Sequence, residues 1–265
     1  MAPAPLVRPT DAPPTAHETD KAIDEIRLRS GQGSLLGPTD LPHHVAIIMD
    51  GNRRWARQRG LDELEGHPAG VEAIRVVLRH ARRRGIRALT LYAFSRENWA
   101  RSDAEVVALF GLLEAAIRSE TAELRAQGVR VQMIGRMNEL PEETRTSIED
   151  ALGATAGGTD MLLTIAFNYA GRTELVDAIR KIVASGARVE DIDEAVIAGA
   201  LYTAGTPDPD LVIRTGGEQR LSNFLIWQSA YAELVTTDTL WPDFGEGSLD
   251  AALLEYASRQ RRFGR

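Results

Sequence analysis

The chain has 265 residues, of which 43% are hydrophobic and 26% charged, proportions that are ordinary for a soluble globular protein with a sizeable core. The formal net charge of −7 argues against a broad nucleic-acid-binding surface, and the absence of cysteine excludes disulfides, thiolate metal sites and cysteine nucleophiles. Because no apolar run reaches the roughly 18 to 20 residues of a membrane span and no signal-peptide pattern opens the chain, we expect a cytoplasmic protein with at most peripheral membrane contact.

The first 41 residues differ in composition from the rest of the chain. Seven of the twelve prolines lie within residues 1–42, and such a segment has too little apolar surface to offset the entropy of ordering. We therefore predict a Pro-rich, largely disordered extension over residues 1–41, in which "ETDKAIDEIRLRS" at 18–30 could form a short surface helix. No internal repeat or later linker is visible, so residues 42–265 are predicted to form one domain.

Short apolar runs alternate with helical patterns along this domain. Nearly continuous apolar runs are typical of strands that are covered on both faces, as in a parallel sheet. Six such runs predict strands at residues 44–49, 88–94, 129–135, 161–168, 210–215 and 233–237.

Helices are predicted in the intervals between these strands. The first has an apolar face from Val71 to Ala81 and ends near Gly85, and the second starts with Ser102 and Glu105 in the spacing of a capping box. Further helices are expected near residues 141–156, 173–185, 190–203 and 248–262. The alternation predicts an α/β fold, a single domain with a central, mostly parallel β-sheet of about six strands flanked by helices and joined by right-handed crossovers.

Unusual residues gather where the predicted strands end. Parallel sheets bind ligands beyond the carboxyl ends of their strands, so these segments are expected at one edge of the sheet. The segments are "DGNRRWARQRG", "SRENWAR", "NYAGR" and "RTGGEQRLSNF". One such segment alone is usually a turn or a solvated surface, but four at one edge indicate a binding site.

The side chains of these segments favour a small polyanion as the ligand. Glycine lets backbone N–H groups approach a ligand closely, and the arginine fork matches pairs of phosphate oxygens. A lone carboxylate among arginines, Asp50, is explained by a magnesium ion that bridges it to a phosphate. The sequence therefore predicts a diphosphate site, and Trp55 and Trp99 indicate an apolar group attached to that diphosphate.

Longer stretches of the sequence resemble one family. These are "HVAIIMDGNRRWA", "GHPAG", "LYAFSRENWAR", "DLVIRTGGEQRLSNFLIWQSAYAEL", "WPDF" and the terminal "RRFG". Spread in order over residues 42–265, they resemble the cis-prenyltransferases, the undecaprenyl diphosphate synthase group. The resemblance implies the cis-prenyltransferase fold, a homodimer and an enzyme that uses Mg2+. It also implies the addition of isopentenyl diphosphate to an allylic diphosphate, farnesyl or geranyl diphosphate, to give a Z-polyprenyl diphosphate of undecaprenyl type or shorter.

The same resemblance implies roles for the first two segments. Asp50 would hold magnesium and assist the departure of the allylic diphosphate, with Trp55 beside it. The residues that would bind this diphosphate are Gly51, Asn52, Arg53, Arg54 and His67. In the second segment, the residues implied in contacting substrate are Ser95, Arg96 and Glu97, and those implied in positioning the reacting carbons are Asn98, Trp99 and Arg101.

For the last third of the chain, the resemblance implies an isopentenyl diphosphate site and a second acid. The residues of that site would be Arg214, Arg220, Leu221 and Ser222. Glu233 matches the family's second metal-associated acid, and the "RRFG" end resembles a tail that reaches the site of the partner subunit.

Asn98 matches the residue to which the family's proton abstraction is often assigned. Because a neutral amide is a very weak base, we expect a diphosphate oxygen or a water molecule, oriented by Asn98, to accept the proton. The sequence has no DDxxD pair of the trans-prenyltransferase kind. Its nearest approach, "DIDE" at 191–194, is interpreted as an exposed helix start.

Two other classes of function were weighed against this one. A phosphatase of the haloacid dehalogenase type also places an aspartate after its first strand but needs a second acid two residues later, where this chain has Asn52. A non-catalytic partner subunit of a cis-prenyltransferase complex would typically lose the metal-binding aspartate and the first loop, and this chain retains both.

Glu63 departs from the family pattern, because many relatives carry at its position an arginine that contacts the allylic diphosphate. Either Glu63 faces the site and repels the diphosphate, or the loop turns outward and Arg57 or Arg59 supplies the missing charge. Product length is not predicted, because apolar residues that line a tunnel have the same sequence pattern as core residues. The small Ala93 next to the site is compatible with a long product.

Overall fold

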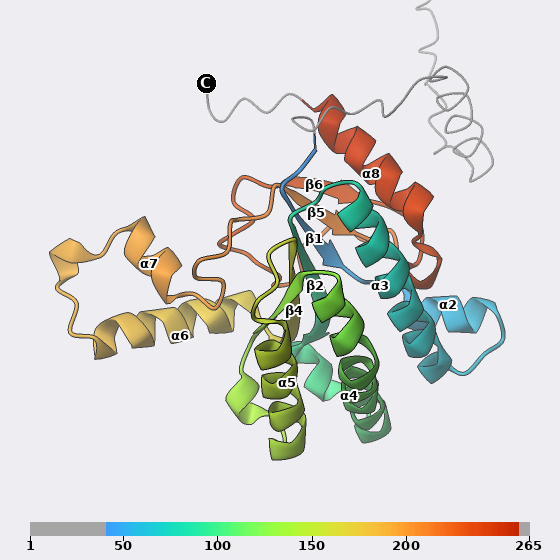
Figure 1. The fold of residues 1–265 in the computed structure, drawn as a ribbon, viewed down its shortest axis with the longest axis horizontal. Helices are drawn as coiled ribbons and strands as arrows, with labels where there is room; N and C mark the ends of the chain where they lie inside the picture. Colours follow the sequence, from blue (N-terminus) through green and yellow to red (C-terminus); the bar gives the residue numbers. More distant parts are fainter. Residues whose placement is uncertain (1–40, 260–265) are drawn as a thin grey trace, which may run out of the picture. The chain divides into compact units, whose positions relative to one another are not determined.

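The structure is a computed structural model that describes residues 41–259. The helix expected at 18–30, nearly all of the predicted extension and the terminal "RRFG" lie outside the described residues. The described part contains a six-stranded sheet in the order β3-β4-β2-β1-β5-β6, surrounded by helices (Figure 1).

All six predicted strands are present, and each end lies within one residue of its predicted position. The strands are β1 His44–Ile48, β2 Ala88–Ser95, β3 Val129–Ile134, β4 Met161–Tyr169, β5 Leu211–Arg214 and β6 Glu233–Thr236. Every pairing between neighbouring strands in this sheet is parallel. The central strand β1 is buried along its whole length, as its uninterrupted apolar run predicts.

The α-helices lie mostly where the sequence places them. They are α2 Asn52–Gln58, α3 Gly66–Arg83, α4 Asp103–Ala126, α5 Glu142–Thr155, α6 Gly171–Ala184, α7 Glu194–Ala200 and α8 Glu246–Ser258. Short 3-10 turns are found at Glu63–Glu65, Arg96–Ala100, Met137–Glu139, Val189–Asp191 and Trp241–Asp243. No helix within residues 41–259 combines the length and the apolar character that crossing a bilayer requires.

Two helical segments differ from the prediction. The helix expected at 190–203 is wrong as a single element, because the Asp193 side chain accepts the N–H of Val196 at 2.9 Å and thereby starts a separate helix, α7. "DIDE" is thus an exposed helix start, as predicted. The other difference is α2, which was not predicted and which begins directly after Gly51. Gly51 adopts φ of +116°, a conformation that L side chains rarely take, and this turns the chain from strand into helix.

Each face of the sheet is covered by a different set of elements. On one face, α4 and α5 pack on an aromatic cluster in which Phe94 and Phe167 stack at 4.9 Å and Phe110 meets Phe167 edge-on at 5.2 Å. The other face is covered by Tyr202 and by the segment after β5, where Phe224 stacks on Tyr92 at 4.6 Å. The sheet is therefore buried on both sides, in agreement with its apolar strands.

The strand order changes direction at β1, and this fixes where a ligand can bind. From β1 the chain passes to β2 and β4 on one side, whereas β5 and β6 lie on the other. The carboxyl ends of β1 and β5 are joined by Thr215, whose hydroxyl accepts the N–H of Asp50 at 2.9 Å and donates to its carbonyl oxygen at 2.7 Å. Ligands of open α/β sheets bind at such a switch point.

Two glycines of "GHPAG" allow α3 to approach the start of α2. A Cβ added at Gly66 would lie against the carbonyl oxygen of Asn52 and 2.6 Å from its carbonyl carbon. At Gly70 it would lie 2.9 Å from the Asn52 side chain and 3.1 Å from Trp241. The start of α2 is therefore in van der Waals contact with α3.

We expect Gly66→Ala to destabilise the protein by about 1 to 3 kcal/mol, because the added methyl group has no room beside the Asn52 backbone. Gly111→Ala is the matched control: it lies in α4 with nothing within 4 Å of an added Cβ, and should raise stability by roughly 0.5 to 1 kcal/mol through helix propensity. Urea unfolding measures both. Equal midpoints for the two variants would show that α2 and α3 are not in this close contact.

Candidate active site

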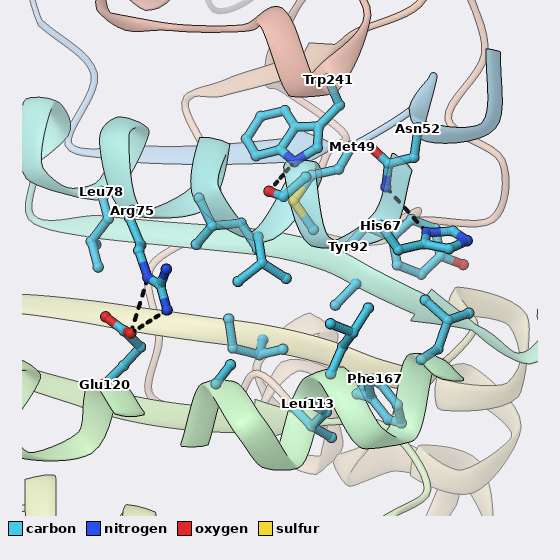
Figure 2. A pocket seen from close by; sticks show the side chains of 18 of the residues that line it. Met49, Asn52, His67, Arg75, Leu78, Tyr92, Leu113, Glu120, Phe167 and Trp241 are labelled. Carbon is cyan, nitrogen blue, oxygen red and sulfur yellow. Dashed lines mark hydrogen bonds and ion pairs between the residues drawn. The ribbon is translucent and has the colours of Figure 1, made fainter. Parts of the chain in front are cut away.

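A cavity of about 610 Å³ extends from the carboxyl ends of the strands along the sheet, between α3 and α4 (Figure 2). Its walls are mainly apolar, with Val71, Ile74, Leu113, Ile117 and Met133 among the side chains that line them. At one end the lining becomes polar and charged, through Asp50, Asn52, Arg53, Arg54, Arg57, His67, Ser95, Asn98, Arg101 and Arg214. The cavity therefore suits a molecule with an anionic end and an apolar body.

Asp50 lies at the centre of the charged end, between two arginines. Its Oδ1 accepts a hydrogen bond from Nη2 of Arg54 at 3.0 Å, and its Oδ2 accepts one from Nη2 of Arg214 at 2.8 Å. Arg54 also donates to the carbonyl oxygen of Gly216 at 2.7 Å, which links α2 to the segment after β5. These charge-assisted hydrogen bonds fix the carboxylate and both guanidinium groups in one orientation.

Arg214 is only 4% exposed, and two of its three guanidinium nitrogens donate hydrogen bonds. Its Nη1 donates to the Ser222 hydroxyl at 2.6 Å and to the carbonyl oxygen of Arg220 at 2.5 Å. Its Nε is a buried donor without a partner, and Oδ1 of Asn52 is a buried acceptor without one. Both residues line the cavity, and unpaired buried polar atoms in a binding site indicate groups that a ligand completes.

His67 connects the first loop to α4. Its Nε2 lies 3.1 Å from Oε1 of Glu105 and its Nδ1 lies 3.5 Å from Nδ2 of Asn52. Burial lowers the pKa of His67 against the opposing effect of Glu105, so the ring is neutral near pH 7. Burial alone would raise the pKa of Glu105, but Arg101 and His67 outweigh it and keep the carboxyl ionised. The ring proton is thereby assigned to Nε2, which donates to the carboxylate.

Glu63 agrees in part with the second alternative, because Arg57 lines the cavity and Glu63 does not. Its carboxylate pairs with Nε of Arg53 and lies 3.1 Å from Nε of Arg57, and both arginines line the cavity. The carboxylate therefore does not point into the cavity as a bare charge. It binds two arginines of the charged end as their counter-ion.

The second predicted loop divides between the cavity and its surroundings. Asn98 lines the cavity, and its Oδ1 accepts the N–H of Ser95 at 2.9 Å, which leaves the amide nitrogen available to donate. Arg101 binds Glu105 at 2.7 Å and also lines the cavity. Arg96, Glu97 and Trp99 are not among the lining residues. Arg96 binds Glu139, Glu97 accepts from the Asn223 side chain at 2.9 Å, and Trp99 donates to the Asn168 side chain at 2.9 Å.

Asn168 and Asn223 organise this region, and no role was predicted for either. Asn168 is fully buried with φ of 49°; its Oδ1 accepts Nε1 of Trp99, and its Nδ2 donates to the carbonyl oxygen of Arg136 at 2.9 Å. Asn223, with φ of 64°, accepts the N–H of Arg172 on its side chain at 2.8 Å and donates to Glu97. Both lie in strand-end segments that the sequence had singled out, and asparagine is the non-glycine residue best suited to a positive φ.

Several predicted residues lie away from the cavity. Trp55 donates from Nε1 to Asp243 at 2.7 Å and is covered by the Arg59 guanidinium at 4.2 Å from its ring centre. Arg220 is exposed and pairs with Glu218. Leu221 packs against the core on the opposite face of the sheet.

Glu233 is not brought to Asp50 in the single chain. It is the first residue of β6 and is aligned with Leu211 and, through it, with Val45, at the amino ends of these parallel strands. At roughly 3.3 Å per residue, this places it about 16 Å along the sheet from Asp50. Its carboxylate binds Arg259 at 2.8 Å. The metal role of Glu233 therefore stays a prediction.

The charged end fits a magnesium ion that arrives with a substrate. Each Asp50 oxygen accepts one hydrogen bond from an arginine and retains a further lone pair, and the carbonyl oxygen of the Asn52 side chain is unpaired. Within residues 41–259 no three His, Asp or Glu side chains gather as a metal site. Magnesium is commonly held by one or two carboxylates together with phosphate oxygens and water, which agrees with this donor set.

Comparison with known proteins places the chain in a family. The family profile described as "Putative undecaprenyl diphosphate synthase" matches residues 48–264. The chain is 50% identical over 229 residues to an isoprenyl transferase of Porphyromonas gingivalis, an alignment that covers 85% of this chain and 90% of the relative.

Two solved structures share the fold. One is lavandulyl diphosphate synthase from Lavandula x intermedia in complex with dimethylallyl diphosphate; it has a TM-score of 0.83 and 41% identity and covers 86% of this chain and 100% of that chain. The other, "a probable undecaprenyl diphosphate synthase" from Campylobacter jejuni, has a TM-score of 0.72 and 28% identity, over 84% of this chain and 99% of that chain. The chain therefore belongs to the undecaprenyl diphosphate synthase family, the cis-prenyltransferases, and is an isoprenyl transferase.

Proposed function

We propose that this isoprenyl transferase condenses isopentenyl diphosphate with an allylic diphosphate in a magnesium-dependent reaction and releases a Z-polyprenyl diphosphate. The observation that carries the proposal is the position of Asp50, held between Arg54 and Arg214 at the mouth of a long apolar cavity. A structural neighbour that binds dimethylallyl diphosphate, an allylic diphosphate, supports it.

The allylic diphosphate binds at the start of α2, with its hydrocarbon chain in the cavity. Arg53, Arg54 and Arg57 line that end and supply cationic donors to the diphosphate. Neutral His67, fixed by Glu105, holds the Asn52 side chain in place. When the allylic C–O bond breaks, negative charge builds up on the departing diphosphate, and fixed guanidinium groups stabilise it without a covalent nucleophile.

Magnesium would be held by Asp50 and by diphosphate oxygens, with the Asn52 carbonyl oxygen within the same donor set. Bound there, the ion would neutralise charge on the leaving diphosphate as a Lewis acid. The protein's own part is orientation: the arginines on either side of Asp50 hold its carboxylate in a fixed position at the mouth of the cavity.

Isopentenyl diphosphate binds on the β5 side of Asp50. The unpaired Nε of Arg214 offers it a donor, and the Ser222 hydroxyl accepts from Nη1 of the same guanidinium group. The proton that condensation releases passes to a diphosphate oxygen or to water. Because Oδ1 of Asn98 is already bound to the Ser95 N–H, the Asn98 amide nitrogen can donate to and orient this acceptor, and it does not act as a base.

We further propose that the enzyme is a cytoplasmic homodimer that contacts membranes peripherally through its product. If the hydrocarbon chain of the product is longer than the cavity, its end is exposed to water unless it enters a bilayer or another apolar site. This supports peripheral contact with a membrane. The alternative of a non-catalytic partner subunit is not favoured, because the chain retains Asp50 with both arginine partners.

Asp50→Ala is expected to reduce turnover by roughly a thousandfold, the effect of losing a charge-stabilising group at the reacting centre. A second measurement is titration of the protein with inorganic diphosphate, with and without MgCl2: wild type should bind more tightly with magnesium, and the variant should not. The matched control is Asp150→Ala, which removes an exposed carboxylate on α5. Near-normal turnover of Asp50→Ala in the presence of magnesium would contradict the mechanism.

Arg220→Ala is expected to raise the KM for isopentenyl diphosphate more than that for the allylic substrate. Loss of a charge-assisted phosphate contact is worth roughly 1.5 to 3 kcal/mol, or about ten- to a hundredfold in KM. Arg118→Ala, which removes an exposed arginine on the outer side of α4, serves as the control. Because Arg220 pairs with Glu218 in the structure, it must change partner to bind substrate. An effect confined to the allylic KM would show that the two substrate sites are reversed.

Glu63→Gln is expected to lower the KM for the allylic diphosphate about 1.4- to fivefold at low salt. The carboxylate competes with the substrate for Arg53 and Arg57, and a partly exposed ion pair is worth about 0.2 to 1 kcal/mol. High salt should shrink the difference, and the KM for isopentenyl diphosphate should not change. Glu65→Gln removes the same charge but retains an acceptor for the Asp62 N–H, so it is the control. If Glu63→Gln leaves the allylic KM unaltered at both salt concentrations, Glu63 is not a competitor.

A further inference from the structure

An ion pair connects the two helices that flank the apolar part of the cavity. Nε and Nη2 of Arg75 on α3 lie 3.0 Å and 2.7 Å from Oε1 of Glu120 on α4. Both residues line the cavity, and Figure 2 shows their side chains extending toward each other from the two helices. The lining residues nearest to the pair in sequence are Ile74, Leu78 and Arg79 on α3, and Ile117 and Thr121 on α4.

The pair is held by further contacts and is only partly exposed to solvent. The Ser119 hydroxyl donates to Glu120 at 2.8 Å and accepts Nη2 of Arg75 at 3.4 Å, and Glu72 binds the remaining arm of the guanidinium. The side chains of Arg75 and Glu120 are 30% and 25% exposed. Moving either charge aside would therefore break several hydrogen bonds together, in surroundings where screening by water is reduced.

The position of the pair is remote from the diphosphate end. Arg75 follows His67 by eight residues on α3 and Glu120 follows Glu105 by fifteen on α4, separations of about 12 Å and 22 Å along the helix axes. Figure 2 places the pair on the opposite side of the view from Asn52 and His67. Beyond it the lining includes Glu123, Leu124 and Gln127, and the side chain of Gln127 donates to Glu123 at 2.6 Å.

We propose that the Arg75–Glu120 ion pair is a determinant of product length, an inference that rests on the proposed function. Each isoprenyl unit that is added pushes apolar chain further from the diphosphate end, and burial of that chain in the cavity favours elongation. When the chain reaches the ion pair, further growth would displace or desolvate two charges and offer them no replacement partner. Elongation past this point is therefore disfavoured, and product dissociates.

The test replaces both charges with an apolar side chain of similar length. The double variant Arg75→Met/Glu120→Met retains good helix formers and extends the apolar lining. With labelled isopentenyl diphosphate and farnesyl diphosphate, its main product should be longer than that of wild type by at least one isoprenyl unit. Arg75→Lys, which preserves the opposite charges, should give the wild-type distribution. Arg118→Met, an equivalent change on the exposed side of α4, should also leave the distribution unchanged.

A binding measurement separates failure of this inference from failure of the proposed function. Linear alkyl diphosphates of increasing chain length are titrated into wild type and into the double variant, with urea unfolding used to verify that both are folded. Affinity should stop rising at a shorter chain in wild type than in the variant. If wild type incorporates no isopentenyl diphosphate, the proposed function fails, and the titration alone then decides on the ion pair. Identical break points, or products of the double variant that are as short as or shorter than those of wild type, would overturn the inference.

Discussion

The Asp50 carboxylate, bound by one guanidinium group on each of its oxygens, is the interaction on which the geometry of the site depends. Arg214 lies at the end of a buried strand with 4% of its surface exposed, and a buried charge without a partner is strongly destabilising. Asp50 supplies the partner and thereby joins the ends of β1 and β5. Arg54 reaches the same carboxylate from α2, so the first helix, the central strand and the segment after β5 are fixed relative to one another by one group.

Internal pairing also explains how an acidic protein can bind polyanions. The net charge is −7, yet arginines gather at one end of the cavity. Each of the five arginines at that end has a carboxylate partner, although only three carboxylates serve them: Arg53 and Arg57 bind Glu63, Arg54 and Arg214 bind Asp50, and Arg101 binds Glu105. The charged end is therefore partly neutralised before substrate binds, and five arginines against three carboxylates leave two positive charges in excess. A diphosphate that replaces Glu63 at Arg53 and Arg57 binds by partner exchange, so its affinity for these two arginines depends on the difference between two sets of ion pairs.

The strands and the location of the site follow from the sequence because both depend on short-range patterns. Uninterrupted apolar runs identify the strands, and the rule for strand ends brings Asp50, Asn98 and Arg214 to one cavity. Helix α2 was missed because its residues, Asn52 to Gln58, have no apolar periodicity; a glycine with positive φ starts it. Partner choice could not be predicted either. Trp55 binds Asp243, 188 positions away, and nothing within either segment indicates that pairing. The distance between Glu233 and Asp50 could not be predicted either. Polar residues occur at both ends of a strand, and the sequence does not indicate that Glu233 lies at the amino ends of the parallel strands, far from Asp50.

Arginine–carboxylate ion pairs have opposite effects on substrate binding at the two ends of the cavity. The effect depends on whether the part of the substrate that reaches the pair is charged or apolar. At the mouth, Glu63 neutralises two arginines that a diphosphate can bind in its place, so breaking those pairs is offset by new charge-assisted contacts. At Arg75 and Glu120 the arriving group is hydrocarbon, which offers neither charge a partner. The cost of breaking the pair is then not recovered, and the burial of each further apolar unit must exceed it for growth to continue. A cavity with an exchangeable ion pair at its entrance and a non-exchangeable one along its wall therefore admits one end of the substrate and limits the other.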